Sequence, residues 1–103
     1  MIVLCTVPSA EEGRRIATAL VKEGLCACVN QLPSVTSYYI YEGNFCEESE
    51  EMLIIKTLPS HFKRLEARIL ELHPYDVPEI IATEINEGNE AYMRWMAGSL
   101  RGE

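Results

Sequence analysis

The sequence predicts a ferredoxin-like α+β sandwich, in which two helices cover one face of an antiparallel sheet and a C-terminal helix follows. The first observation is the order of hydrophobic patterns along the chain: strand, helix, strand, strand, helix, strand, helix. The second is a long hairpin pattern between Val35 and Thr57, whose centre Glu42-Gly43-Asn44 favours a turn. No linker or low-complexity segment interrupts residues 1–103, so we expect a single domain.

The first part of the chain predicts a strand and then a helix. Residues Met1 to Val7 are nearly all apolar, which is typical of a central strand covered on both faces. Ser9 followed by Glu12 is a capping-box signal for a helix start, and Gly24 suits the helix end. Apolar residues recur between them at helical spacing, at Ile16, Ala17, Leu20 and Val21.

A disproportionately long hairpin is predicted in the middle of the chain. A short apolar run, Leu25–Asn30, precedes Val35–Tyr41, and Met52–Thr57 is the returning strand. Pairing that continues toward Phe45 would carry the tip beyond ordinary strand length, with Tyr38, Tyr39, Ile40 and Tyr41 on it. A small domain cannot cover such a ribbon, and long free edges pair with partner strands. We therefore expect a homo-oligomer in which the ribbon packs on neighbouring copies.

The last part predicts a helix, a strand and a third helix. The second helix carries an apolar stripe of Phe62, Leu65, Ile69 and Leu72. Because a proline disfavours the α region for the preceding residue, Pro74 should end this helix at Leu72 or His73. The last strand is expected over Ile80–Ile85, and Asn89 can cap the third helix. The inner face of that helix would carry Tyr92, Trp95, Met96 and either Ser99 or Leu100.

Composition excludes several functions. The formal charge is −7, from nine Lys and Arg against sixteen Asp and Glu, and the basic residues are scattered. Nucleic acid and anionic membranes are therefore poor partners, whereas metal cations or further copies of the chain fit better. No apolar run could span a bilayer or form a signal-peptide core. Four cysteines in a chain without a secretion signal indicate reduced thiols, and we therefore expect the protein to be located in the cytoplasm.

The stretch from Leu72 to Ile80 is a rigid corner with two prolines, and one of only two histidines in the chain, His73, directly precedes the first of them. His73 has two interpretations: it could cap the second helix, or it could be a metal ligand or proton carrier. The other histidine, His61, is expected on the surface. Cys5 lies on the first strand, and this position alone predicts a residue of the hydrophobic core. Near His73, however, it would complete a thiolate and imidazole set that suits Cu or Zn.

Other polar or sulfur-bearing groups favour simpler interpretations. Cys26 and Cys28 are two residues apart on a predicted strand, so both should point to one face as small core residues, or as a bridge for a soft metal. The acidic run Glu47, Glu48, Glu50 and Glu51 is expected to be a solvated face. No nucleophile elbow, phosphate loop or zinc-protease motif is present. We therefore expect no enzyme and no organic cofactor.

In its motifs the chain resembles the CutA divalent-cation tolerance family, from Ile2 to Leu100. The residues that carry the resemblance are Leu4-Cys5-Thr6-Val7-Pro8, Cys26-Ala27-Cys28-Val29-Asn30, Pro33 to Ser37 with Tyr41-Glu42-Gly43, Glu51, Leu53-Ile54-Ile55-Lys56-Thr57, Leu72-His73-Pro74-Tyr75, Pro78-Glu79-Ile80, Gly88, Tyr92 and Trp95. The resemblance implies a cytoplasmic homotrimer assembled through the long hairpins, with a role in handling divalent metals.

The resemblance also implies a metal site. A copper site in some members corresponds here to Cys5 and His73, while Leu72 stands where a two-histidine version has its other histidine. The first hypothesis is therefore a trimer that binds copper or another divalent ion weakly, through His73 with Cys5 or carboxylates. The second is a regulatory trimer that binds a small molecule or a protein in clefts between subunits, with only incidental metal contacts. Those clefts would be lined by Tyr38, Tyr39, Tyr41, Lys56, Tyr75 and Trp95. A third is a stable scaffold with incidental metal contacts.

Overall fold

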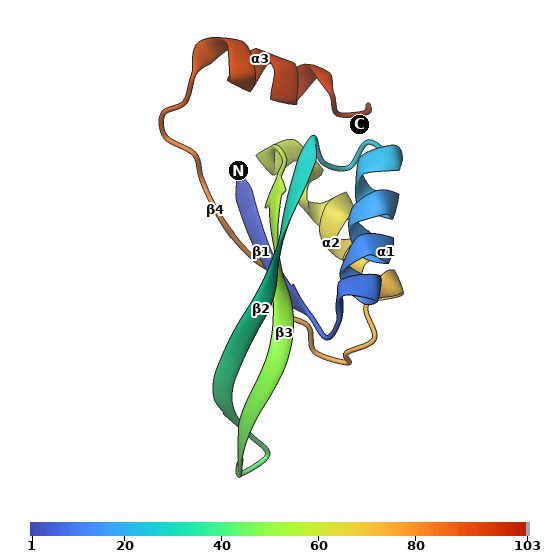
Figure 1. Cartoon of the computed structure of the whole chain (residues 1–103). Helices are drawn as coiled ribbons and strands as arrows, with labels where there is room; N and C mark the ends of the chain where they lie inside the picture. Colours follow the sequence, from blue (N-terminus) through green and yellow to red (C-terminus); the bar gives the residue numbers. More distant parts are fainter. Residues whose placement is uncertain (103) are drawn as a thin grey trace.

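The computed structural model describes residues 1–102 and confirms the ferredoxin-like sandwich; Glu103, the last residue of the predicted domain, lies outside them. The elements are β1 (Ile2–Val7), α1 (Ala10–Lys22), β2 (Cys28–Tyr41), β3 (Asn44–Lys56), a 3-10 turn (Pro59–His61), α2 (Phe62–Leu72), β4 (Ile81–Thr83) and α3 (Glu90–Gly98). The strands form one antiparallel sheet in the order β2-β3-β1-β4. Helices α1 and α2 lie side by side on one face of this sheet (Figure 1).

The core lies between the sheet and these two helices. Val3, Cys5 and Val7 on β1 are fully buried because alternate residues of the strand face the helices. They pack in one cluster with apolar residues of both helices, Ile16, Leu20, Leu65 and Ile69. Ile2 and Leu4 point to the opposite face, which α1 and α2 leave open.

Local signals place the helix ends where the sequence predicts them. The Ser9 side chain accepts a hydrogen bond from the Glu12 amide (3.2 Å), and the Asn89 side chain accepts one from the Tyr92 amide (2.9 Å). Helix α2 ends at Leu72, directly before the extended His73. These caps satisfy amide groups that have no partner within their own helix.

The hairpin is longer than predicted, because β2 already starts at Cys28 and stays paired with β3 up to Tyr41 opposite Asn44. Its two-residue turn has positive φ at both positions, 51° at Glu42 and 82° at Gly43, as hairpin turns require. An irregularity between Leu32 and Val35 interrupts the pairing. Beyond this irregularity the ribbon extends well past the body of the domain (Figure 1), and the molecule as a whole, ribbon included, is 45 Å long.

Two predictions about the C-terminal part need correction. The last strand covers only Ile81–Thr83 rather than Ile80–Ile85, because it is an edge strand that pairs only with β1. Helix α3 lies beyond the end of the sheet, apart from α1 and α2 (Figure 1), so of its predicted inner face only Met96 is fully buried. Tyr92 and Trp95 remain 41% and 51% exposed.

The prediction that His61 lies on the surface is wrong. Its ring is buried, and Nε2 donates to the Arg101 carbonyl at 2.8 Å. Arg64 binds the same carbonyl, and the Arg101 amide donates to Gly24. The chain that follows α3 therefore covers His61, a contact between residues 40 positions apart that no local pattern reveals.

Candidate metal site at the proline corner

The proline corner places His73 in the interior. Because Pro74 follows, His73 leaves the helical region (φ −74°, ψ 136°) and turns its ring toward β1. The ring is buried, and its backbone amide donates the last hydrogen bond of α2, to Ile69. The capping interpretation therefore holds for the backbone of His73 but not for its side chain.

Both ring nitrogens of His73 have partners within the chain. Nε2 lies 2.8 Å from the Thr6 carbonyl oxygen, and Nδ1 lies 3.1 Å from the Tyr75 amide nitrogen. A carbonyl can only accept a hydrogen bond and an amide N–H can only donate one. The ring is therefore the neutral tautomer with its proton on Nε2, donated to Thr6, and with Nδ1 accepting from Tyr75.

The structure brings Cys5 to the same carbonyl oxygen. The Cys5 thiol is fully buried, and its Sγ lies 3.8 Å from the Thr6 oxygen as a donor. Burial raises the pKa of the Cys5 thiol to about 12, and the nearby charges of Glu79 and Glu50 add to the shift. Cys5 and His73, which are 68 residues apart in the sequence, thus share one acceptor.

This pair fits a soft metal in donor type but not in number. Thiolate and imidazole are suitable ligands for copper or zinc, and a metal held by both would take the place of the two protons that now point at Thr6. Leu72 supplies no side-chain ligand, and its carbonyl is bound by Arg15. Residues 1–102 contain no group of three or more His, Cys, Asp or Glu side chains that could hold a metal ion. The corner offers two ligands rather than a closed site.

The sequence reasoning missed Glu50, which was expected to be solvated with the other acidic residues of β3. Its side chain is only 7% exposed, and Oε2 accepts a hydrogen bond from the Tyr75 hydroxyl at 2.7 Å. The Tyr75 ring lies 4.7 Å from the His73 ring at an angle of 48°. Burial and the Glu50 carboxylate raise the pKa of Tyr75. Tyr75 thus contacts both His73 and the hairpin.

Of the two cysteines expected to be small core residues or a bridge for a soft metal, only Cys26 lies in the core. Cys26 is 1% exposed and belongs to the core, whereas Cys28 is half-buried and lies opposite Lys56. Val29, next along β2, packs against the core, so Cys28 points to the open face of the sheet. The prediction that both cysteines share a face is wrong, because the chain bends at Ala27 before β2 begins.

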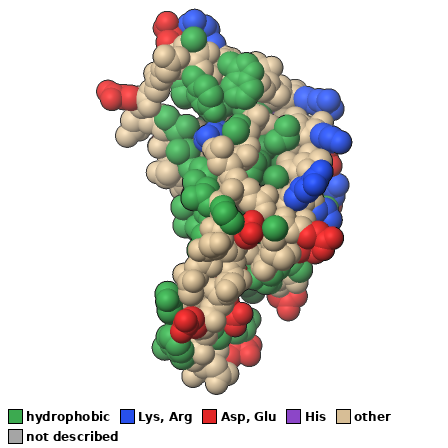
Figure 2. Space-filling view, in the orientation of Figure 1, with side chains coloured by type: hydrophobic (Ala, Val, Ile, Leu, Met, Phe, Trp, Pro, Cys, Tyr) green, Lys and Arg blue, Asp and Glu red, His purple; other side chains and the backbone are tan. Residues whose placement is uncertain are grey.

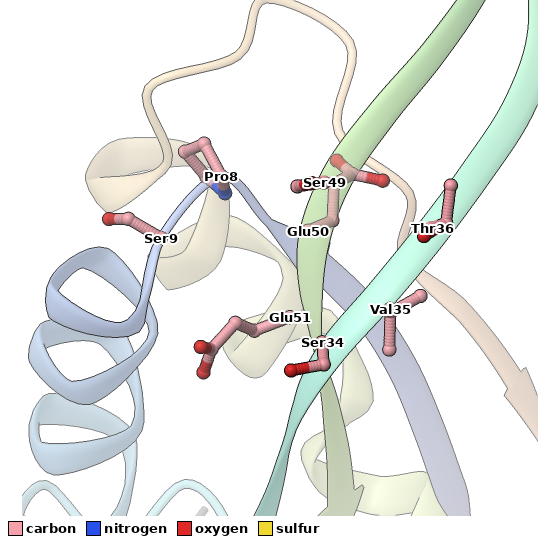
Figure 3. A pocket seen from close by; sticks show the side chains of 8 residues that line it. All are labelled: Pro8, Ser9, Ser34, Val35, Thr36, Ser49, Glu50 and Glu51. Carbon is pink, nitrogen blue, oxygen red and sulfur yellow. The ribbon is translucent and has the colours of Figure 1, made fainter.

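A shallow pocket of about 350 Å³ lies where the hairpin leaves the body of the domain (Figure 3). It is lined by the segment entering α1 and by both hairpin strands: Pro8, Ser9, Ser34, Val35, Thr36, Ser49, Glu50 and Glu51. Hydroxyl and carboxylate groups predominate. None of the six residues predicted to line clefts between subunits borders this pocket.

The fold and the corner define a small α+β protein with a long hairpin and a buried thiol–imidazole pair. A family model described as "CutA1 divalent ion tolerance protein" matches residues 1–99, and the chain belongs to this family. It is 50% identical over 95 residues to the divalent-cation tolerance protein CutA of Thermus thermophilus, and the match covers 92% of each chain.

Solved structures agree with this assignment. The crystal structure of CutA1 from Oryza sativa has a TM-score of 0.97 and 42% identity, over 99% of this chain and 94% of that one. The structure described as "PII-like protein CutA from Nostoc sp. PCC 7120 in apo form" has a TM-score of 0.90 and 38% identity, over 97% and 96% of the two chains.

Proposed function

We propose that the protein is a homotrimer that binds copper or another divalent cation weakly, at Cys5 and His73, and thereby contributes to divalent-cation tolerance without acting as an enzyme. The observation that carries this proposal is that the Cys5 thiol and the His73 imidazole both donate to the Thr6 carbonyl. The names of the relatives support the biological role.

The geometry supports weak binding. A metal must remove the proton of a buried thiol whose pKa is about 12 and must replace the hydrogen bond from His73 to Thr6. Each lost hydrogen bond costs about 0.5–1.5 kcal/mol, and two ligands provide less binding free energy than the three or four of most protein metal sites.

Calorimetry with copper under reducing conditions tests the site. We expect that His73→Ala and Cys5→Ala each lower the affinity at least tenfold, because each removes one of two ligands. The matched controls are His61→Ala, which removes the other buried imidazole, and Cys26→Ala, which removes a core thiol whose pKa burial also raises to about 12. Unchanged affinity in His73→Ala, or an equal loss in His61→Ala, would exclude the proposed site.

The open face of the sheet and the hairpin support the homotrimer. Exposed apolar side chains gather on the hairpin at the lower end of the molecule (Figure 2), and they include Tyr38, Tyr39, Ile40, Tyr41 and Phe45. Exposed apolar side chains gathered in this way are typical of a surface that another chain covers.

We also propose a cytoplasmic location, for which the four free cysteines are the support. No helix within residues 1–102 is long and apolar enough to cross a membrane. The compartment differs among relatives, since the protein from Archaeoglobus fulgidus is described as periplasmic. Fractionation of cells that express the tagged chain would test the location.

A second function is favoured by the polar pocket at the hairpin base and by the "PII-like" description of the Nostoc relative. In this alternative the trimer binds a small molecule or a protein between its subunits, and metal contacts are incidental. A thermal shift caused by a metabolite in the presence of a chelator would favour it. Shifts that occur only with metal would count against it.

A further inference from the structure

We propose that Glu50 and Glu79 bind an organic cation, with an ammonium or guanidinium group held between the two carboxylates. The site lies where the base of the hairpin meets the proline corner. It goes beyond the proposed metal site and does not depend on it, because carboxylate oxygens and a positively charged N–H group replace the thiol, the imidazole and the soft metal.

The observation that carries the proposal is a buried carboxylate without a cation. Glu50 is only 7% exposed, and its Oε2 accepts a hydrogen bond from the Tyr75 hydroxyl at 2.7 Å. Its other oxygen, Oε1, accepts no hydrogen bond within residues 1–102, and no ion pair of these residues includes Glu50. Every fully buried side-chain oxygen in the same range has a partner, so Oε1 must be open to solvent. A carboxylate removed from water in this way is unfavourable unless a positive group compensates it.

Glu79 supplies a second carboxylate at the same place. Partial burial and the charge of Glu50 raise the pKa of Glu79, so the two groups are close enough to repel each other. Glu79 also belongs to no ion pair within the described part of the chain. A cation between the two carboxylates would turn this repulsion into two attractive contacts.

The chain itself offers no side chain that could neutralise the pair. Residues 23–55, which include the whole hairpin, contain no Lys, Arg or His, and neither do residues 74–93, which follow His73. Both ring nitrogens of His73 already have backbone partners, and the ring is neutral. The hairpin base and the corner therefore produce a negative potential that attracts a cation from outside the chain.

The available groups fit an organic cation better than a metal ion. Hard metal ions require about six oxygen ligands, and residues 1–102 contain no group of three or more His, Cys, Asp or Glu side chains that could hold one. An ammonium or guanidinium group needs only acceptors for its N–H groups, and its hydrogen bonds to carboxylates are among the strong ones. The Tyr75 hydroxyl fixes Glu50, and the Tyr75 ring adds an aromatic surface suited to a cation.

The test is a reversal in the effect of one substitution. Glu50→Gln removes the charge but keeps an amide oxygen for the Tyr75 hydroxyl. Without an organic cation, this variant should be at least as stable in urea at pH 7 as the unmodified protein, because it lacks the uncompensated charge. Putrescine, a linear diamine, should stabilise the unmodified protein and not the variant. Calorimetry at low ionic strength should show at least tenfold weaker putrescine binding in Glu50→Gln and in Glu79→Gln.

The matched control is Glu47→Gln, because Glu47 lies on the same strand but is exposed, and this variant should bind putrescine as the unmodified protein does. Sodium chloride at equal ionic strength controls for screening. Equal putrescine affinity in Glu50→Gln and the unmodified protein, or an equal loss in Glu47→Gln, would overturn the proposal.

A further measurement identifies the source of the cation. If Glu50→Gln weakens self-association in sedimentation experiments without putrescine, the cation is a Lys or Arg side chain of a neighbouring copy, and the proposed chemistry holds. If the unmodified protein binds no putrescine and Glu50→Gln leaves self-association unchanged, the proposal is wrong. Copper binding at Cys5 and His73 is measured separately, so either site can fail without the other.

Discussion

Removal of two apolar side chains from the hairpin should dissociate the proposed trimer. Ile40 and Phe45 lie directly opposite each other in the β2–β3 register and are 73% and 68% exposed in the single chain. The double variant Ile40→Ser, Phe45→Ser removes this apolar pair from the ribbon. It leaves the core untouched, because neither residue belongs to the buried cluster.

The magnitude follows from the exposed fractions. Full burial of an Ile or Phe side chain contributes about 1.5–3 kcal/mol. With about two thirds of each side chain left to bury, the pair contributes roughly 2–4 kcal/mol per protomer. Three copies give about 6–12 kcal/mol, which corresponds to an increase of at least about four orders of magnitude in the trimer dissociation constant.

Sedimentation equilibrium at micromolar concentration measures this loss directly. We expect three chain masses for the unmodified protein, one chain mass for the double variant, and unchanged circular dichroism for both. Leu70→Ser is the control, because Leu70 is 52% exposed but lies on α2, on the covered face of the sheet, and should leave the trimer intact. A monomeric unmodified protein, or a double variant that stays trimeric, would refute the reasoning.

Two further substitutions test pH dependence and packing. Partial burial and the charge of Glu50 raise the pKa of Glu79 in the folded protein. The stability that protonated Glu79 contributes is therefore present below the unfolded pKa of about 4.3 and is lost as the pH rises through the folded pKa. Glu79→Gln should therefore be more stable than the unmodified protein in urea at pH 7, but not near pH 4; an equal difference at both pH values would contradict this. At Gly13 an added Cβ would lie 2.6 Å from the Gln31 amide nitrogen and 3.1 Å from Val7. Gly13→Ala should displace Gln31 from its two hydrogen bonds. The loss of these hydrogen bonds exceeds the gain of about 1 kcal/mol in helix propensity, so the free energy of unfolding should fall by about 1 kcal/mol. In the Gln31→Ala background the same change should stabilise the protein.

The sequence predicts most of the fold because the relevant signals are local. The caps at Ser9 and Asn89 lie within three residues of the amides that they bind, and Pro74 ends α2 through a clash with its immediate neighbour. The turn at Glu42 and Gly43 is equally local. The length of the hairpin is underestimated, because β2 is paired with β3 from Cys28 onward. The length of the last strand is overestimated, because β4 pairs with β1 over only three residues.

The candidate site is less predictable because its contacts join distant segments. The approach of Cys5 to His73 depends on how α2 packs against β1, and neither residue carries a local signal of it. Glu50 looks solvated among its acidic neighbours, and it is buried only because the corner folds over it. His61 is buried for the same reason, by a tail 40 residues away. A strand or helix pattern therefore predicts exposure for polar residues that a distant segment of the chain in fact buries.

The hydrogen bonds at the proline corner bear directly on the proposed metal site. The His73 proton resides on Nε2 and is donated to Thr6, Tyr75 donates to Glu50 at the base of the hairpin, and burial keeps the thiol of Cys5 protonated. A metal held by Nε2 and Sγ would have to replace both protons and the hydrogen bond from His73 to Thr6. Leu72 supplies no imidazole that would offset this cost. Weak metal binding is therefore the expected consequence of the hydrogen bonding at this corner.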